Sequence, residues 1–215
     1  MTFHIVTLFP NAFDSYLGES ILKRAIEDKK IKVRFYNPRD FAEDKWSRVD
    51  RAPYGGGPGM VIQVLPVARA IEKALKVCGK NKSKIKIVYF TPNGKQFDTL
   101  YAKNAAKKYE HIIFVCGRYE GIDARVKKMF KMEEVSIGPY VLTGGELPAM
   151  IMIDSISRQI EGVLGDFSSL EESRIASHET YTRPEIVEYK KKKYRVPKVL
   201  LSGNHKLIDE WRKNK

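Results

Sequence analysis

Cysteine is scarce in this sequence, and other marks of secreted or membrane-spanning proteins are missing. Cys78 and Cys116 are the only cysteines among 215 residues, and they lack the spacing of a metal-binding motif. No apolar run reaches the roughly 18 residues that a membrane span needs. The N-terminal segment has neither the basic start nor the cleavage site of a signal peptide. We therefore expect a cytoplasmic protein with reduced thiols, no membrane segment and no metal site.

Negative charge is also in short supply. Lysine and arginine number 39 against 26 aspartates and glutamates, so the net charge is +13. A protein this basic attracts polyanions, of which RNA and DNA are the usual ones. Solvated lysines alone would give the same excess, so charge makes nucleic-acid binding a hypothesis and no more.

Strand-like and helix-like segments alternate along most of the chain. Apolar, β-branched runs predict strands over residues 4–9, 31–36, 85–90, 111–116 and 133–137. Helical spacing predicts helices over 11–26, 64–77, 98–109, 121–130 and 147–160, the first of them capped by Asn11. This alternation predicts an α/β fold with a mostly parallel sheet and helices on both faces. Ligands of such sheets bind beyond the carboxyl ends of the strands, which points to the loops after Phe90, Cys116 and Ile137.

Two regions depart from this pattern. Residues 37–61 are rich in proline, glycine and charge, which predicts a long irregular loop of the kind that is often functional. After Gly165 the periodicity stops. We expect a domain over 1–165, a polar linker over 166–180, and a small basic domain over 181–215 with one short helix.

Four glycine-containing segments are the candidate binding motifs. They are 53–60 (PYGGGPGM), 91–94 (TPNG), 117–123 (GRYEGID) and 136–148 (SIGPYVLTGGELP). The first allows close backbone approach to a ligand, yet it is neither a Walker A loop nor the dinucleotide-binding fingerprint. Taken singly, each segment is also consistent with an ordinary turn or surface loop.

The third and fourth segments carry side chains suited to a ligand. Glu120 is the better ligand candidate of two carboxylates, because Asp123 fits the first turn of the next helix, where the dipole favours it. Pro148 suits the first turn of the helix after the fourth segment. That segment also offers glycines that can wrap a flat ligand and apolar side chains that can pack on a ring: Gly138, Gly144, Gly145, Tyr140 and Leu142.

Together these segments resemble the TrmD family, the bacterial tRNA (guanine-N1)-methyltransferases that modify the guanosine at tRNA position 37. The matching pieces span almost the whole chain in the family's order: 53–60, 116–123, 136–148, 162–165, 181–184 and 196–205. Any one piece is weak, but six in order are very specific.

The resemblance implies a fold and a methyl donor. The fold is the SPOUT type, an α/β domain with a deep C-terminal trefoil knot, which periodicity alone does not predict. The family works as a homodimer with active sites at the subunit interface and S-adenosyl-L-methionine in the knot. The implied donor contacts are Tyr89, Phe90, Thr91, Gly94, Gly117, Glu120, Ser136, Ile137, Gly138, Tyr140, Leu142, Gly144 and Gly145.

The resemblance also implies tRNA as the partner, and the basic run at 190–193 can grip phosphates without reading sequence. His205 also suits the start of the last helix. The expected RNA contacts are Tyr54, Gly55, Gly56, Gly57, Pro58, Gly59, Arg183, Lys190, Lys191, Lys192, Lys193 and His205.

The chemistry requires a base and a cation. Guanine N1 carries a proton that a carboxylate can remove, and negative charge that then builds on O6 can be stabilised by an arginine. Arg158 occupies the family's arginine position. The family's base is an Asp followed by Ser, whereas here Glu172 precedes Ser173; Glu171 and Asp166 are the alternatives.

These departures keep other interpretations open. The linker is shorter than usual, and the sequence ends at Lys215, before the further helices that family members usually carry. One alternative is therefore a catalytically impaired module that holds cofactor or RNA, and another is a nucleotide-binding protein that uses the glycine-rich loop. Whether Mg²⁺ takes part is also open.

Overall fold

The computed structural model describes residues 1–165 and 179–213 of the chain. The chain divides into two compact units, Met1–Leu164 and Gly165–Lys215. The first unit contains the strands β1 (Thr2–Val6), β2 (Lys32–Tyr36), β3 (Asp50–Arg51), β4 (Val61–Ile62), β5 (Ile85–Gln96), β6 (His111–Val115) and β7 (Glu133–Ser136). Its helices are η1 (Pro10–Phe13), α1 (Asp14–Leu17), α2 (Ser20–Glu27), η2 (Pro38–Phe41), α3 (Val64–Cys78), η3 (Lys82–Lys84), α4 (Thr99–Lys108), α5 (Arg125–Met129) and α6 (Glu146–Ser157).

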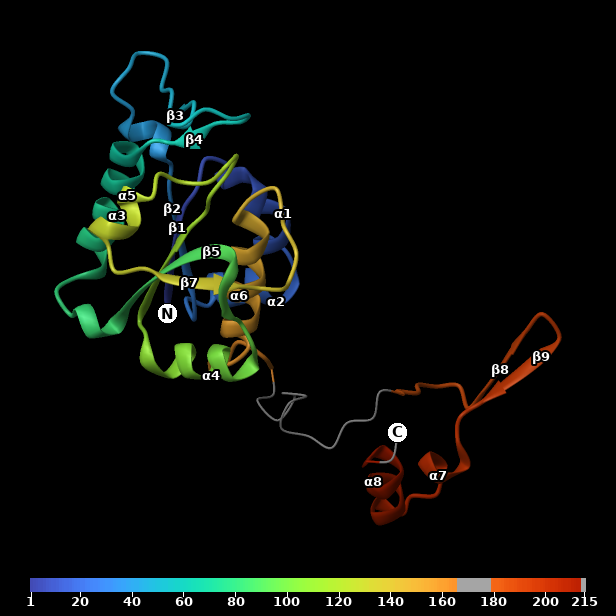
Figure 1. Ribbon diagram of the computed structural model, residues 1–215. Coiled ribbons are helices and arrows are strands. Elements are labelled where there is room, and N and C mark those ends of the chain that lie inside the picture. The colour runs from blue at the N-terminus through green and yellow to red at the C-terminus, as the bar shows by residue number, and fades with distance from the viewer. Residues whose placement is uncertain (166–178, 214–215) are drawn as a thin grey trace. The chain divides into compact units, whose positions relative to one another are not determined.

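A five-stranded parallel sheet forms the centre of the first unit, in the order β2-β1-β6-β5-β7. Helices α3 and α5 cover one face, and α1, α2, α4 and α6 cover the other (Figure 1). Each face has its own apolar core, because successive side chains of a strand point to opposite faces. The predicted α/β fold with helices on both faces is confirmed.

Helix α3 illustrates how the pattern sets the packing. Val67, Ile71, Ala74 and Cys78 recur at helical spacing and are all buried on the sheet. The helix ends at Gly79, whose φ of +80° suits a residue without a Cβ.

The N-terminal elements differ from the prediction. β1 ends at Val6 rather than residue 9, because the Thr7 hydroxyl accepts a hydrogen bond from the Phe9 amide and turns the chain. The single helix expected over 11–26 is broken into η1, α1 and α2. The chain leaves the helix after Leu17, because Glu19 is extended at φ −127° and ψ 151°, and Ser20 begins α2 with a φ of +50°. Asn11 lies inside η1 and caps nothing with its side chain.

The predicted boundaries of two further elements in the first unit were also wrong. β5 runs on through residues 91–94, where a turn was expected, and its pairing with β7 shifts register between Phe90 and Lys95. The helix expected over 121–130 begins only at Arg125. Before it, Ile122 forms an isolated β-bridge with Ile62 and is therefore not helical. The loop expected over 37–61 contains η2 and β3 as well as irregular chain.

The second unit contains a β-hairpin that the sequence reasoning missed. β8 (Ile186–Tyr189) pairs antiparallel with β9 (Lys192–Arg195), and the helices α7 (Lys198–Leu201) and α8 (His205–Lys213) follow. The expectation was a basic run with one short helix. Among the described residues, no helix is long and apolar enough to cross a membrane.

Candidate functional site

Three loops from neighbouring strands surround one open cavity of about 270 Å³ at the carboxyl edge of the sheet. They follow β6 and β7 and include the irregular part of β5, as expected for a parallel sheet. The lining residues are Tyr89, Phe90, Thr91, Pro92, Gly117, Arg118, Tyr119, Glu120, Gly121, Val135, Ser136, Ile137, Gly138, Tyr140, Val141, Leu142, Thr143, Gly144, Gly145 and Pro148.

The structure brings together every residue expected to contact the methyl donor except Gly94. Gly94 lies in β5 against the backbone of β7, where an added Cβ would come within 2.6 Å of the Glu134 carbonyl carbon. Its lack of a side chain therefore serves strand packing in this structure.

Hydrogen bonds within the loop after β7 stabilise its conformation. The Ser136 hydroxyl donates to the Gly138 carbonyl at 2.9 Å, and the Tyr140 hydroxyl donates to the Ile137 carbonyl at 3.2 Å. The Tyr140 ring lies so close to Gly138 that an added Cβ would meet it at 2.2 Å. Tyr140 and Leu142 nevertheless keep exposed apolar surface at the cavity, which suits contact with a flat ring.

The buried carboxylate of Glu146 connects the segments that surround the cavity. Glu146, in the first turn of α6, accepts a hydrogen bond from the Thr7 hydroxyl at 2.7 Å and pairs with Arg118 Nε at 2.9 Å. Its side chain is 3% exposed, against 25% for Arg118. The Arg118 guanidinium also lies 4.7 Å from the centre of the Phe9 ring. This network joins the loop after β1 to the loop after β6 and to α6.

Two glycines make this network possible. An added Cβ at Gly144 would lie 2.4 Å from Arg118 Nε and 2.6 Å from Glu146 Oε2. The Gly145 amide donates to the Gly117 carbonyl at 3.0 Å, and an added Cβ there would meet the Cys116 Cα at 2.7 Å. The paired glycines thus allow the β7 loop to lie directly against the β6 loop.

Tyr89 lines the cavity, and Cys116 is buried directly before the lining residue Gly117. Burial raises the pKa of Tyr89, whose ring lies beneath Gly117 and Gly121. Burial also raises the pKa of the Cys116 thiol well above its usual value, with the Glu146 charge adding to the effect. Both groups therefore stay neutral at neutral pH and offer packing rather than charge.

The glycine-rich segment joins the cavity through Glu120. The Glu120 amide donates to the Met60 carbonyl at 3.0 Å, and an added Cβ at Gly59 would meet Glu120 Oε1 at 2.5 Å. Glu120 borders both the cavity and a second open hollow that includes Tyr54, from the segment expected to bind RNA. Tyr54 itself is fully exposed, and Gly55, Gly56 and Gly57 all have positive φ.

Of the two predicted catalytic residues only Arg158 is described, and it does not line the cavity of this chain. Arg158 directly follows α6, and Gly145 directly precedes it, so the helix separates them by roughly 20 Å at 1.5 Å per residue. The predicted base Glu172, with its alternatives Glu171 and Asp166, lies outside the described residues. Asp123 accepts hydrogen bonds from Arg125 just before α5, in keeping with a structural role.

The remaining predicted RNA contacts are exposed in the second unit. Arg183 precedes β8, and residues 190–193 form the turn of the hairpin and the start of β9. His205 is the first residue of α8, but the Asn204 side chain accepts the capping hydrogen bond from the Leu207 amide at 3.3 Å.

Sequence reasoning missed the residues that act through long-range contacts. Thr7 and Glu146 are 139 positions apart, and no local pattern links them. Arg118 and Tyr119 lie within the candidate segment 117–123. Their position between two glycines at the end of a predicted strand is the sequence signal that could have identified them as cavity residues.

The family model and several similar relatives all carry the name of one tRNA methyltransferase. Residues 1–215 match the family described as tRNA (Guanine-1)-methyltransferase TrmD. A tRNA (guanine-N(1)-)-methyltransferase of Clostridioides difficile (strain 630) is 49% identical over 217 residues, covering 99% of this chain and 91% of the relative. The protein of that name from Geobacter sulfurreducens is 48% identical, covering 100% of this chain and 86% of the relative. The one from Photobacterium profundum is 43% identical, covering 97% and 82%.

Proposed function

Because the chain belongs to the tRNA (guanine-1)-methyltransferase TrmD family, we propose that it transfers a methyl group from S-adenosyl-L-methionine to N1 of guanosine 37 in tRNA. The family has the SPOUT fold, to which the parallel sheet with helices on both faces conforms. The trefoil knot, the homodimer and a cytoplasmic location are parts of the same proposal. In the structure, Cys78 and Cys116 are both free thiols.

The cavity carries this proposal, because it gathers loops from three adjacent strand ends around a glycine-lined hollow. Its volume of about 270 Å³ is close to the lower end of the roughly 300–1,000 Å³ typical of small-molecule sites. The lining combines apolar side chains with the carboxylate of Glu120. These residues fit S-adenosyl-L-methionine, which joins a flat adenine ring to a cationic centre.

S-Adenosyl-L-methionine supplies an electrophilic methyl group carried on a positively charged sulfonium. Glu120 provides the negative charge that favours such a cation near the cavity. The backbone of Gly138, Gly144 and Gly145 can approach a flat ring closely. Buried contacts of Glu146 with Thr7 and Arg118 hold the loops in place, so that little reorganisation is needed on binding.

The two predicted catalytic residues act on the target guanine. The carboxylate of Glu172 takes the proton from guanine N1, which frees a lone pair on that nitrogen. The Arg158 guanidinium stabilises the negative charge that builds on O6. Because Arg158 lies at the far end of α6 from the cavity of its own chain, we assign it to the cavity of a partner subunit.

Analysis of the product tests this assignment. Purified protein, labelled S-adenosyl-L-methionine and unmodified tRNA should give 1-methylguanosine after digestion to nucleosides. Glu172→Gln should lose most of this turnover while donor binding, measured by calorimetry, stays within about two-fold of wild type. A protein that binds the donor but gives no product, with or without Glu172→Gln, would instead be a binding module.

A further inference from the structure

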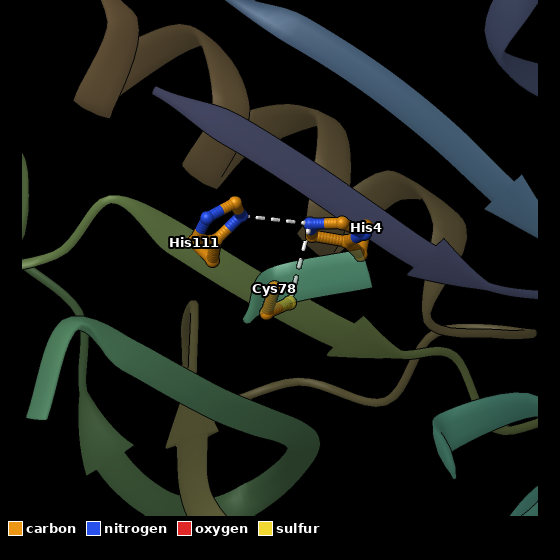
Figure 2. A group of neighbouring side chains, drawn as sticks. All are labelled: His4, Cys78 and His111. Atoms are coloured by element: carbon orange, nitrogen blue, oxygen red, sulfur yellow. Dashed lines mark hydrogen bonds between the residues drawn. The ribbon is translucent and has the colours of Figure 1, made fainter. Parts of the chain in front are cut away.

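A second cluster of reactive side chains lies outside the cavity, on the face of the sheet that α3 covers. His4 comes from β1, His111 from the start of β6, and Cys78 is the last residue of α3 (Figure 2). His4 Nε2 lies 3.1 Å from His111 Nδ1 and 3.4 Å from Cys78 Sγ. One ligand atom from each residue lies within 4.8 Å of the others. Within residues 1–165 and 179–213, no other group of this kind combines three such side chains.

Two of the three separations are close to those of a tetrahedral metal site. Zinc–nitrogen bonds of about 2.0–2.1 Å and zinc–sulfur bonds of about 2.3 Å give tetrahedral edges of about 3.3 Å and 3.6 Å. The two observed separations are each within about 0.2 Å of these edges. The ligand atoms of His111 and Cys78 lie within 4.8 Å of each other.

A further residue already orients the central ligand. The Tyr36 hydroxyl lies 2.9 Å from His4 Nδ1 in a fully buried contact. When His4 carries its proton on Nδ1 and donates to Tyr36, the lone pair on Nε2 points at His111 and Cys78. Metal-binding histidines are commonly fixed in this way through their second nitrogen.

Ordinary hydrogen bonding is the competing explanation. One proton shared between two imidazoles holds His4 to His111, and the Cys78 thiol donates to the Ala74 carbonyl at 3.2 Å. The third pairing, His4 Nε2 with Cys78 Sγ at 3.4 Å, is within the range of a sulfur hydrogen bond. A cation would engage all three lone pairs at once.

The surroundings of the cluster are mixed in charge. Arg34 and the N-terminal amine of Met1 oppose a cation near His111, whereas Glu110 favours one. Imidazole binds metal ions in its neutral form.

We propose that His4, Cys78 and His111 form a binding site for Zn²⁺ or a similar transition-metal ion, with solvent as the fourth ligand past the half-buried edge of His111. Imidazole and thiolate ligands select such metals, whereas Mg²⁺ prefers oxygen. The site joins β1, β6 and the end of α3 at positions far apart in the chain. No local motif in the sequence indicates this site, because the three residues come from separate elements.

Cobalt substitution tests the proposal on the whole protein. Metal-stripped, reduced protein should take up one equivalent of Co²⁺ and develop a thiolate-to-cobalt absorption band, which Zn²⁺ then displaces. Cys78→Ser should abolish the band. His111→Gln should weaken Zn²⁺ binding more than about 100-fold, beyond the 10–100-fold that loss of an outer-shell partner costs. Tyr36→Phe removes such a partner and should weaken Zn²⁺ binding by about 10–100-fold.

Matched variants separate this site from surface binding. Cys116→Ala removes the other thiol, and His205→Gln removes an exposed imidazole; both should keep the band and the Zn²⁺ affinity. Zn²⁺ should also raise the melting temperature of wild type but not of Cys78→Ser. Absence of the thiolate band in folded wild type would overturn the proposal, and so would equal Zn²⁺ affinity in wild type and Cys78→Ser.

Discussion

Gly144 shows how a missing side chain can hold a binding site together. The space that its Cβ would occupy is filled by the Arg118 and Glu146 side chains. Those two groups form a largely buried ion pair. The position therefore tolerates glycine alone, for reasons of packing and not of backbone conformation.

Gly144→Ala should separate the Arg118–Glu146 pair. We expect a loss of about 1–3 kcal/mol in the free energy of unfolding, as for other overpacked interiors, and weaker binding of S-adenosyl-L-methionine. Denaturant unfolding and calorimetry measure the two effects. Gly165→Ala is the matched control, because an added Cβ there meets none of the described residues within 4 Å. Equal stability of the two variants would contradict this view of Gly144.

Glu146→Gln should destabilise the protein more than removal of a surface carboxylate. The change leaves Arg118 without its charge partner, and breaking a buried pair typically costs about 3–5 kcal/mol. We expect the lower end of that range, because Arg118 is a quarter exposed. Glu134→Gln, which removes an exposed pair with Lys127, should cost less than about 1 kcal/mol. Urea unfolding of both variants decides the matter, and similar losses would contradict a buried role for Glu146.

At this scale the sequence predicted the residues that local motifs mark. Gly138, Gly144 and Glu120 stood in recognisable segments, and the structure places them around one cavity. Thr7, the His4 cluster and the packing role of Gly94 could not be predicted, because each depends on a partner from a distant strand or helix.

Among the elements, the β8–β9 hairpin carries the most unusual backbone. Its two-residue turn consists of Lys190 and Lys191, with φ of +50° and +63°. Such turns normally use Asn-Gly, since side chains make positive φ costly. Two lysines at the tip accept that cost and present positive charge at the end of an exposed hairpin.

The double change Lys190→Asn with Lys191→Gly gives the turn its preferred residues and separates backbone strain from charge. The hairpin should become more stable while tRNA binding weakens. The slope of log affinity against log salt should fall by about 1.4–1.8 if each lysine contacts one phosphate. Fluorescence anisotropy over a salt series measures the slope. Lys80→Gln with Lys82→Gln removes equal charge from the first unit, and an equal effect there would contradict specific contacts by the hairpin.

Element boundaries were harder to predict than element types. The apolar runs of β1, β6 and α3 show their periodicity directly, and the structure has them. The break at Ser20 and the lysine turn carry no such signal, because both put ordinary residues at positive φ. Tertiary contacts, not local preference, determine these positions.

For the whole molecule, the role proposed for Arg158 requires a cavity other than that of its own chain, because Arg158 lies roughly 20 Å along α6 from Gly145. A homodimer meets this requirement, if each cavity is completed by the Arg158 of the other subunit. Exposed apolar side chains on α6, Leu147 and Ile151, are available for such contact.

Mixed dimers test this arrangement. Glu120→Ala and Arg158→Ala should each abolish most activity as homodimers. A heterodimer of the two, isolated with different affinity tags, should recover about half of the wild-type rate, because one of its cavities then has both groups intact. An inactive heterodimer would mean that Glu120 and Arg158 act within one subunit.

The most direct measurement of the central claim is methyl transfer to two tRNA transcripts that differ only at position 37. With labelled S-adenosyl-L-methionine, the transcript with guanosine 37 should gain 1-methylguanosine, and the transcript with adenosine 37 should gain no label. Equal labelling of both transcripts, or none in either while the donor binds, would contradict the account.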